Sequence, residues 1–257
     1  MNILAPSGYK DFLWAVELHH FGFEIIGLWP KTDKFARLWS EIRISIILIL
    51  LIFVLNIPMI YTITQIWDDM VLVINNLQTT LPFVAASVKY VIMRWKRTVF
   101  SSIVNMMAED WMVLKLDAER NVMIRQARIA RLIMIIGYFF VLVGFFALFI
   151  SSYFGIKDSE ITNFTNADKQ LPLQTYYFYD INKSPQYELT YFIHFTTVLF
   201  GAIIYMCIDI FLILITLHIC GQLENFRCRL SKLVSCKDFN KTLNNITSTH
   251  LRLIRYK

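Results

Sequence analysis

The sequence predicts an all-α, polytopic membrane protein: a helical bundle with four transmembrane helices and a cytoplasmic N-terminus. Two observations predict this class. Hydrophobic residues make up 56% of the 257 residues, and they gather in four contiguous runs separated by more polar segments. Each run can cross a hydrocarbon core of about 30 Å, because a helix rises about 1.5 Å per residue. Helices are expected because lipid cannot hydrogen-bond to exposed backbone groups.

The four predicted spans are bounded by charged residues. Only Trp67-Asp68-Asp69 separates the first two runs, so these are expected to form a helical hairpin. Pro58 should kink the first span, and Pro82 lies within the second. The spans cover residues 44–66, 70–93, 132–156 and 189–219 of a bundle at 44–219, with cytoplasmic segments at 1–43 and 220–257.

The basic residues predict the orientation. Of the 25 Lys and Arg residues, 21 lie in segments that face one side of the membrane if the spans alternate, and three lie between spans three and four. Positively charged flanks stay in the cytoplasm, so both ends of the chain are expected inside. The net charge of +6 therefore predicts contact with anionic lipid rather than nucleic acid. Glycosylation sequons at Asn163 and Asn182 lie in the loop predicted to be outside.

The segments outside the spans are also expected to be largely helical. Asp11–Pro30 is too polar to cross the membrane and is predicted to be an interfacial helix that ends at Pro30. Residues 94–131 contain no Gly or Pro, and their apolar residues recur at helical spacing. Residues 221–234 mix apolar and basic positions without a strong helix break. The amphipathic residues 250–257 run to the end without a stop signal, so we expect the sequence to be incomplete.

Two charged residues lie deep in the predicted spans. Lys89 and Asp209 are each about 20 residues from the outer end of their helix, which places them at similar depth. Charges within a membrane are costly and are often paired or functional, so we expect a structural charge pair. The alternative is that each side chain reaches the cytoplasmic headgroups separately.

The outer parts of spans two, three and four combine aromatic side chains with small polar ones. A mostly apolar pocket with a few polar groups suits a small hydrophobic ligand. The alternative is ordinary helix packing with an aromatic belt at the membrane interface. The candidate ligand contacts are Val73, Asn76, Leu77, Thr80, Phe146, Phe149, Tyr153, Tyr191, Phe195 and Thr196.

An enzyme is not expected. HExxH, GxSxG and phosphate-binding Gly-rich motifs are absent from the sequence, which predicts no catalytic residues and no cofactor. The four cysteines form no CxxC or Cys/His cluster, so neither a metal site nor a disulfide is expected. A transporter would show internal repeats, which the sequence lacks, and a G-protein-coupled receptor would require an outside N-terminus.

The order of several short motifs resembles the insect odorant receptor family. They are Gly27-Leu28-Trp29-Pro30, Asp110-Trp111, Glu119-Arg120, Arg128-Ile129-Ala130-Arg131, Leu171-Pro172-Leu173, Ser184-Pro185, Tyr187-Glu188-Leu189-Thr190-Tyr191, Ile208-Asp209, His218-Ile219, Gln222-Leu223 and His250-Leu251-Arg252-Leu253-Ile254. Each motif is degenerate alone, and their order and spacing carry the resemblance along nearly the whole chain.

The resemblance implies a seven-helix receptor of which this chain supplies the first part, with 220–257 leading to a missing fifth helix. It implies an odorant-gated cation channel, a hetero-tetramer with a co-receptor subunit, in the plasma membrane of olfactory sensory neurons. Odorants would bind in the outer part of the bundle, whereas the pore helix, the seventh, is missing. A gustatory receptor of the same topology and a non-conducting truncated receptor remain alternatives.

Overall fold

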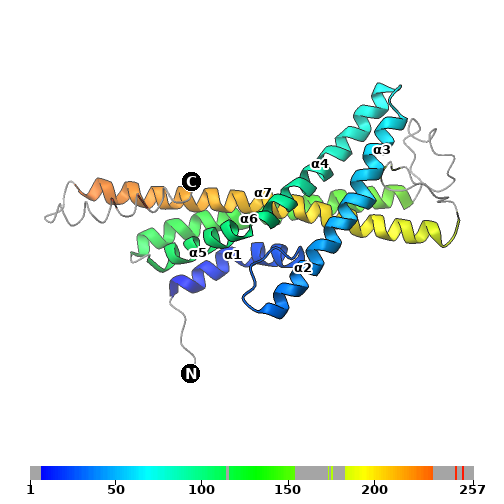
Figure 1. Ribbon diagram of the computed structural model, residues 1–257. Coiled ribbons are helices and arrows are strands. Elements are labelled where there is room, and N and C mark those ends of the chain that lie inside the picture. The colour runs from blue at the N-terminus through cyan, green and yellow to red at the C-terminus, as the bar shows by residue number, and fades with distance from the viewer. Residues whose placement is uncertain are drawn as a thin grey trace. The chain divides into compact units, whose positions relative to one another are not determined.

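The computed structural model describes residues 7–113, 116–153, 173, 175, 183–233, 247 and 251. Within these residues all regular structure is helical, which confirms the predicted all-α class (Figure 1). The elements in chain order are α1 (Ser7–Ile25), α2 (Lys34–Ile49), the π-helix η1 (Leu50–Asn56), α3 (Ile57–Gln65), α4 (Met70–Trp95), α5 (Arg97–Val113), α6 (Asp117–Tyr153) and α7 (Gln186–Leu233).

Four helical stretches are long and apolar enough to cross a membrane, and each overlaps one predicted span. They are Lys34–Gln65, Met70–Trp95, Asp117–Ile150 and Gln186–Ser231. The stretches are longer than the predicted spans because their amphipathic flanks continue the same helix. The predicted helices in 94–131 and 221–234 are confirmed by α5, by the start of α6 and by the end of α7.

The chain divides into two compact units. The first contains Met1–Phe21, Lys96–Ile135 and Asp209–Lys257, and the second contains Gly22–Trp95 and Ile136–Ile208. The helices α1, α6 and α7 contribute residues to both units. Each unit is held by its own contacts.

In the second unit, α3 and α4 form the predicted tight hairpin and lie side by side (Figure 1). The backbone N–H of Asp69 donates to the carbonyl of Ile66 at 3.0 Å, which closes the turn. The Asp69 carboxylate accepts from the backbone N–H groups of Val71 at 3.0 Å and Leu72 at 3.3 Å. An acidic cap of this kind satisfies donors that the first helical turn leaves open.

The first span contains a π-helix immediately before Pro58. Proline has no N–H, so it cannot donate to the carbonyl of Val54 in the α-helical pattern. The backbone of Val54 is instead hydrogen-bonded to the side chain of His194 from α7. Asn56 also donates from its amide to the Ser87 hydroxyl on α4 at 2.8 Å. The predicted distortion is therefore spread over the seven residues of η1 rather than confined to a kink at Pro58.

The helix α1 ends before Gly27, not at Pro30 as predicted. Gly27 has a φ of 76°, a left-handed conformation that glycine adopts without steric cost. The N–H of Gly27 donates to the carbonyl of Glu24, and that of Leu28 donates to the carbonyl of Phe23. These bonds satisfy carbonyls at the helix end, so glycine stops the helix before proline is reached.

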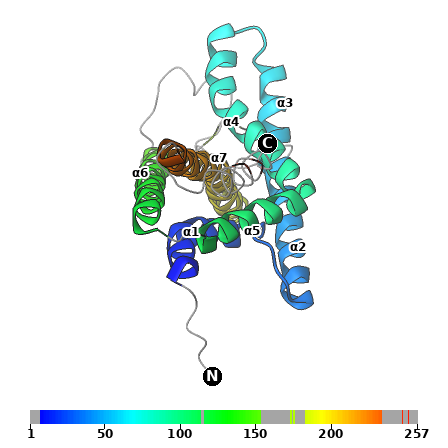
Figure 2. The same cartoon turned by 90° about the vertical axis from the view of Figure 1, so that its left-hand side faces the viewer.

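The first unit is joined by ion pairs between helices that are distant in the sequence. Arg120 on α6 makes two hydrogen bonds to Asp11 on α1, of 2.6 and 2.9 Å. Figure 2 shows α1 beside α5 in this unit, and Gly8 lies against the backbone of Trp111 there. Arg120, a basic residue of the segment between spans two and three, thus binds an acidic partner within the protein.

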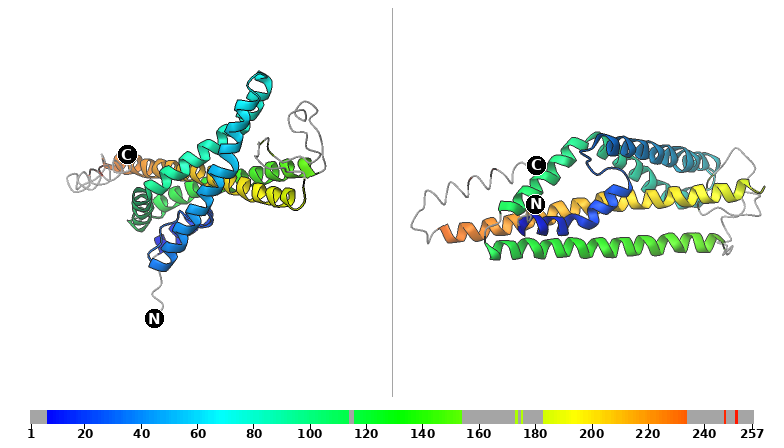
Figure 3. Two further views of the ribbon diagram at one scale, coloured as in Figure 1. Left: turned by 45° about the vertical axis from the view of Figure 1, so that its right-hand side comes forward. Right: turned by 90° about the horizontal axis from the view of Figure 1, so that it is seen from below.

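The helices α6 and α7 lie side by side within each unit (Figure 3). In the first unit Arg125 donates two hydrogen bonds to Glu224, at 2.6 and 2.8 Å. In the second unit the Tyr138 hydroxyl lies 2.7 Å from the Cys207 thiol. In the second unit, this pairing brings together the parts of the third and fourth spans where ligand contacts were predicted.

Candidate functional site

Four aromatic rings from α6 and α7 form a cluster in the second unit. Phe149 lies 4.8 Å from Phe195 and 5.6 Å from Tyr191, measured between ring centroids, and both pairs are edge-to-face. Phe145 lies 4.7 Å from Phe195 and 4.8 Å from Phe149. Offset and edge-to-face pairs at these separations are favourable beyond the area that they bury. The structure therefore brings together three of the predicted contact residues, Phe149, Tyr191 and Phe195.

The cluster contains one residue that the sequence prediction missed. Phe145 is buried, whereas its predicted neighbour Phe146 is 52% exposed and touches only the edge of the cluster through Phe145. The prediction chose the face with spacing i, i+3, i+7, but Phe145 and Phe149 share a face at i, i+4. Tyr191 and Phe195 on α7 have the same i, i+4 spacing, and this shared spacing was the sequence signal that could have identified Phe145.

One polar group in the cluster is fixed by a backbone bond. The Tyr191 hydroxyl donates to the carbonyl of Phe149 at 3.2 Å, across from α7 to α6. The bond orients the Tyr191 ring and leaves the hydroxyl oxygen as an acceptor. The side chain of Tyr153 lies outside the part of the chain that the structure describes.

On α4 the predicted polar pair is buried and internally bonded. Asn76 and Thr80 are both almost fully buried, and the Thr80 hydroxyl is 2.8 Å from the Asn76 side-chain oxygen. The same hydroxyl is 2.9 Å from the Asn76 carbonyl. Val73 packs in a small apolar cluster with Ile66, while Leu77 is 37% exposed.

On α7 the two neighbouring threonines have different surroundings. The Thr196 hydroxyl donates to the carbonyl of Phe192 at 3.0 Å and is exposed. Thr197 and His194 are fully buried. The face of α7 that points inward at this level thus carries His194 and Thr197, which the sequence prediction did not include among the contacts.

The helices α4 and α7 approach each other closely at Gly201. A Cβ atom at this position would lie 2.8 Å from the ring of Phe83, so only glycine allows this approach. Nearby, the Lys89 ammonium lies 4.1 Å from the centre of the Tyr205 ring, a cation–π contact. In the second unit, α4 is therefore in direct contact with α7, one of the two helices that carry the aromatic cluster.

Some predicted sites stay predictions. Lys89 belongs to the second unit and Asp209 to the first, so their pairing is untested. Asn163 and Asn182 lie outside the described residues. Among the described residues no group of three His, Cys, Asp or Glu side chains is arranged to hold a metal ion.

Comparison with known proteins identifies relatives of the same architecture. A family model for the 7tm Odorant receptor matches residues 69–257. No curated protein sequence matches the chain. The structure is similar to that of the insect olfactory receptor OR5 from Machilis hrabei in complex with eugenol, with a TM-score of 0.78 and 14% identity. It is also similar to OR5 solved without mention of a ligand, with a TM-score of 0.65 and 18% identity.

Each of these matches covers 97% of this chain and 64% of the OR5 chain. The chain thus spans less than two thirds of the length of the receptor that it resembles. At these identities the likeness establishes the fold. The helical membrane architecture predicted from the sequence is confirmed by this likeness and by the four apolar helices.

Proposed function

Because the chain belongs to the odorant receptor family, a family of receptors rather than of enzymes, we propose that it binds small, volatile, hydrophobic molecules between its membrane-spanning helices. The observation that carries this proposal is the aromatic cluster of Phe145, Phe149, Tyr191 and Phe195, in which the two α6 rings are buried and the two α7 rings are half-buried. The OR5 structure of the same fold is described as a complex with eugenol, a small aromatic molecule. Aromatic rings provide large apolar contact surfaces and also favour ring–ring geometry with such a ligand.

The proposed contacts are the rings of the cluster together with polar groups near them. The Tyr191 hydroxyl is held by Phe149 and can accept a hydrogen bond from a ligand. The rings already lie within van der Waals contact of one another, so binding requires them to separate by rotamer changes. The other proposed contacts are Val73, Asn76, Leu77, Thr80, Phe146, Tyr153 and Thr196.

At the level of the whole receptor, we propose that ligand binding gates a cation channel. The channel would be a hetero-tetramer with a co-receptor subunit in the plasma membrane of olfactory sensory neurons. Membership of the odorant receptor family supports this proposal. The chain's own part is ligand binding, because its described helices include the aromatic cluster.

A binding experiment tests the proposal. The detergent-solubilised chain is titrated with eugenol as the probe, and its melting temperature is followed. Ligand that binds only the folded state raises stability by about 2.7 kcal/mol at 100 times the dissociation constant. We expect a concentration-dependent rise, and Phe149→Ala should weaken binding about tenfold or more, because it removes ring contacts worth about 1.5 kcal/mol or more.

Phe140→Ala is the matched control for this variant. Phe140 is on the same helix and is 67% exposed, and its ring contact is with the neighbouring Phe139. Its loss should leave eugenol binding unchanged. Equal affinity in wild type and Phe149→Ala would place the ligand elsewhere. Cation flux in cells that express the whole receptor together with a co-receptor tests gating separately, so binding without flux there would overturn only the channel proposal.

A further inference from the structure

In the first unit, a buried hydrogen-bond donor has no protein partner. Trp111 on α5 is only 2% exposed, and its indole N–H has no hydrogen-bond partner among the described residues. Nearly all buried polar groups in native proteins bind either protein or ordered water. An unpartnered indole N–H at this depth therefore indicates a missing acceptor.

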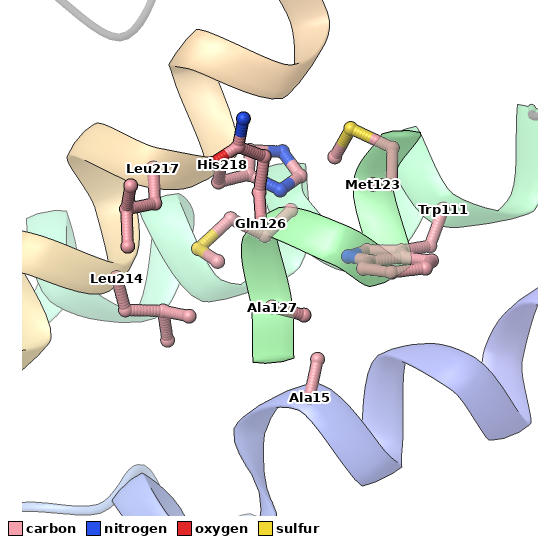
Figure 4. Close-up of a pocket in the computed structure, with 9 residues that line it drawn as sticks. Ala15, Trp111, Met123, Gln126, Ala127, Leu214, Leu217 and His218 are labelled. Carbon is pink, nitrogen blue, oxygen red and sulfur yellow. The ribbon is translucent and has the colours of Figure 1, made fainter. Parts of the chain in front are cut away.

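The Trp111 side chain lines a small cavity formed by residues of α1, α5, α6 and α7. Figure 4 shows that the nitrogen-bearing end of the indole is the end that faces the other lining side chains. The space available to the centre of a water molecule is about 10 Å³. A cavity needs about 10–15 Å³ by this measure to hold one water molecule. The site is thus large enough for one water and too small for an odorant.

The cavity also has polar groups that can hold a water molecule. Its lining includes the amide of Gln126 on α6, which makes no hydrogen bond with any described residue, and the imidazole of His218 on α7. The Nε2 atom of His218 lies 3.1 Å from the Asp110 carboxylate. A buried water usually has two to four such partners.

From these observations we infer that one water molecule occupies this cavity as a fixed part of the first unit. It accepts the hydrogen bond of the Trp111 indole and donates to the side-chain oxygen of Gln126. The remaining lining is aliphatic or methionine, with Met107, Met123 and Leu214 among it, and a thioether sulfur is only a weak acceptor for the indole N–H. The water links α5 to α6, next to the buried pair of Asp110 and His218.

An isosteric replacement of one atom tests this inference. Trp111 in the full chain is replaced by benzothienylalanine, which keeps the two-ring shape and has sulfur in place of the N–H. If a water accepts from the indole, the replacement breaks a bonded network, and the melting temperature should fall by about 2–4 °C. If the cavity is dry, the replacement removes an unsatisfied donor, so an unchanged or higher melting temperature overturns the inference.

The same replacement at Trp67 is the matched control. Trp67 lies in the turn between α3 and α4 and is largely exposed, so its N–H can reach solvent, and no change is expected there. A second readout is the indole hydrogen-bonding band in the ultraviolet resonance Raman spectrum, taken as the difference between wild type and Trp111→Phe. A hydrogen-bonded Trp111 band supports the bound water, and a band typical of a free N–H overturns it.

Discussion

The Tyr90 hydroxyl on α4 donates a 2.6 Å hydrogen bond to the carbonyl of Ile26, 64 residues earlier in the chain. Both groups are fully buried in the second unit. Ile26 follows the last residue of α1, where helix carbonyls lack intrahelical partners. The tyrosine therefore supplies the missing donor and fixes the end of α1 against the C-terminal part of the second span.

Replacement of this tyrosine gives the first prediction. Tyr90→Phe keeps the ring but leaves the Ile26 carbonyl buried without its donor, which should cost about 1–3 kcal/mol. The melting temperature of the solubilised protein should fall accordingly. Tyr9→Phe removes a hydroxyl from an exposed ring on α1 and should have no measurable effect. Equal melting temperatures for wild type and Tyr90→Phe would show that the bond contributes nothing.

Two glycines should respond in opposite directions to the same substitution. At Gly27 the φ of 76° and a Cβ placed 3.1 Å from the Ser40 carbonyl oxygen make alanine unfavourable by about 1–2 kcal/mol. At Gly144, in the interior of α6, a Cβ would meet nothing within 4 Å. There alanine should stabilise by about 0.5–1 kcal/mol, because it reduces the flexibility of the unfolded chain.

Thermal unfolding of the two variants measures this difference. Gly27→Ala is expected to melt below wild type and Gly144→Ala above it. A stabilising Gly27→Ala would contradict the left-handed helix end. Unfolding of Gly144→Ala below wild type would show that another group occupies the space beside α6.

The sequence predicted the membrane helices well because their signal is local. Length and apolar content identify each span, and a segment without Gly or Pro, such as 97–113, continues a helix once one has begun. The end of α1 was predicted less well. Proline at position 30 is a strong sequence signal, but the helix ends just before Gly27. There Ser40 and Arg43 from α2 donate hydrogen bonds to the carbonyls of Gly27 and Glu24.

The site was predicted only in part for a similar reason. A helix with Phe145, Phe146 and Phe149 has two plausible aromatic faces, and both fit helical periodicity. Which face turns inward depends on the rings that α7 presents, Tyr191 and Phe195. That choice is a tertiary contact, so one sequence could not decide between Phe145 and Phe146.

Two ion pairs in the first unit should differ greatly in their effect on stability. Glu119 is largely buried and receives two hydrogen bonds from Arg229, of 2.6 and 2.7 Å. Removing it by Glu119→Ala takes the carboxylate away from a partly buried arginine and should cost about 3 kcal/mol. The pair of Arg125 and Glu224 is exposed at both side chains, so Glu224→Ala should cost about 0–1 kcal/mol.

Chemical denaturation of each single variant measures both values, and the double variant of Glu119 and Arg229 adds a check. Because the double variant removes both charges, it should be less destabilised than Glu119→Ala, which keeps the arginine without its carboxylate. Equal losses for Glu119→Ala and Glu224→Ala would contradict the burial of the first pair.

A buried histidine should make stability depend on pH. Burial lowers the pKa of His19 to about 4. The backbone of Ile210 raises the pKa in part, and the positive charge of Arg131 lowers it further. Neither ring nitrogen has a hydrogen-bond partner of normal geometry among the described residues. In the unfolded chain the pKa is about 6.5, so between pH 6.5 and 4 the unfolded state binds the extra proton. Stability should therefore fall as the pH falls through this range, by about 3 kcal/mol in total from this group.

The measurement is the free energy of unfolding at several pH values for wild type, His19→Gln and His20→Gln. Other groups also titrate in this range, so the difference between wild type and each variant isolates one histidine. The loss of stability between pH 6.5 and 4 should be smaller in His19→Gln, because the residue that binds a proton in the unfolded chain but stays neutral in the folded core is gone. His20→Gln changes the exposed neighbour on the same helix and should keep the wild-type slope. Parallel curves for wild type and His19→Gln would mean that His19 can be protonated in the folded protein without cost.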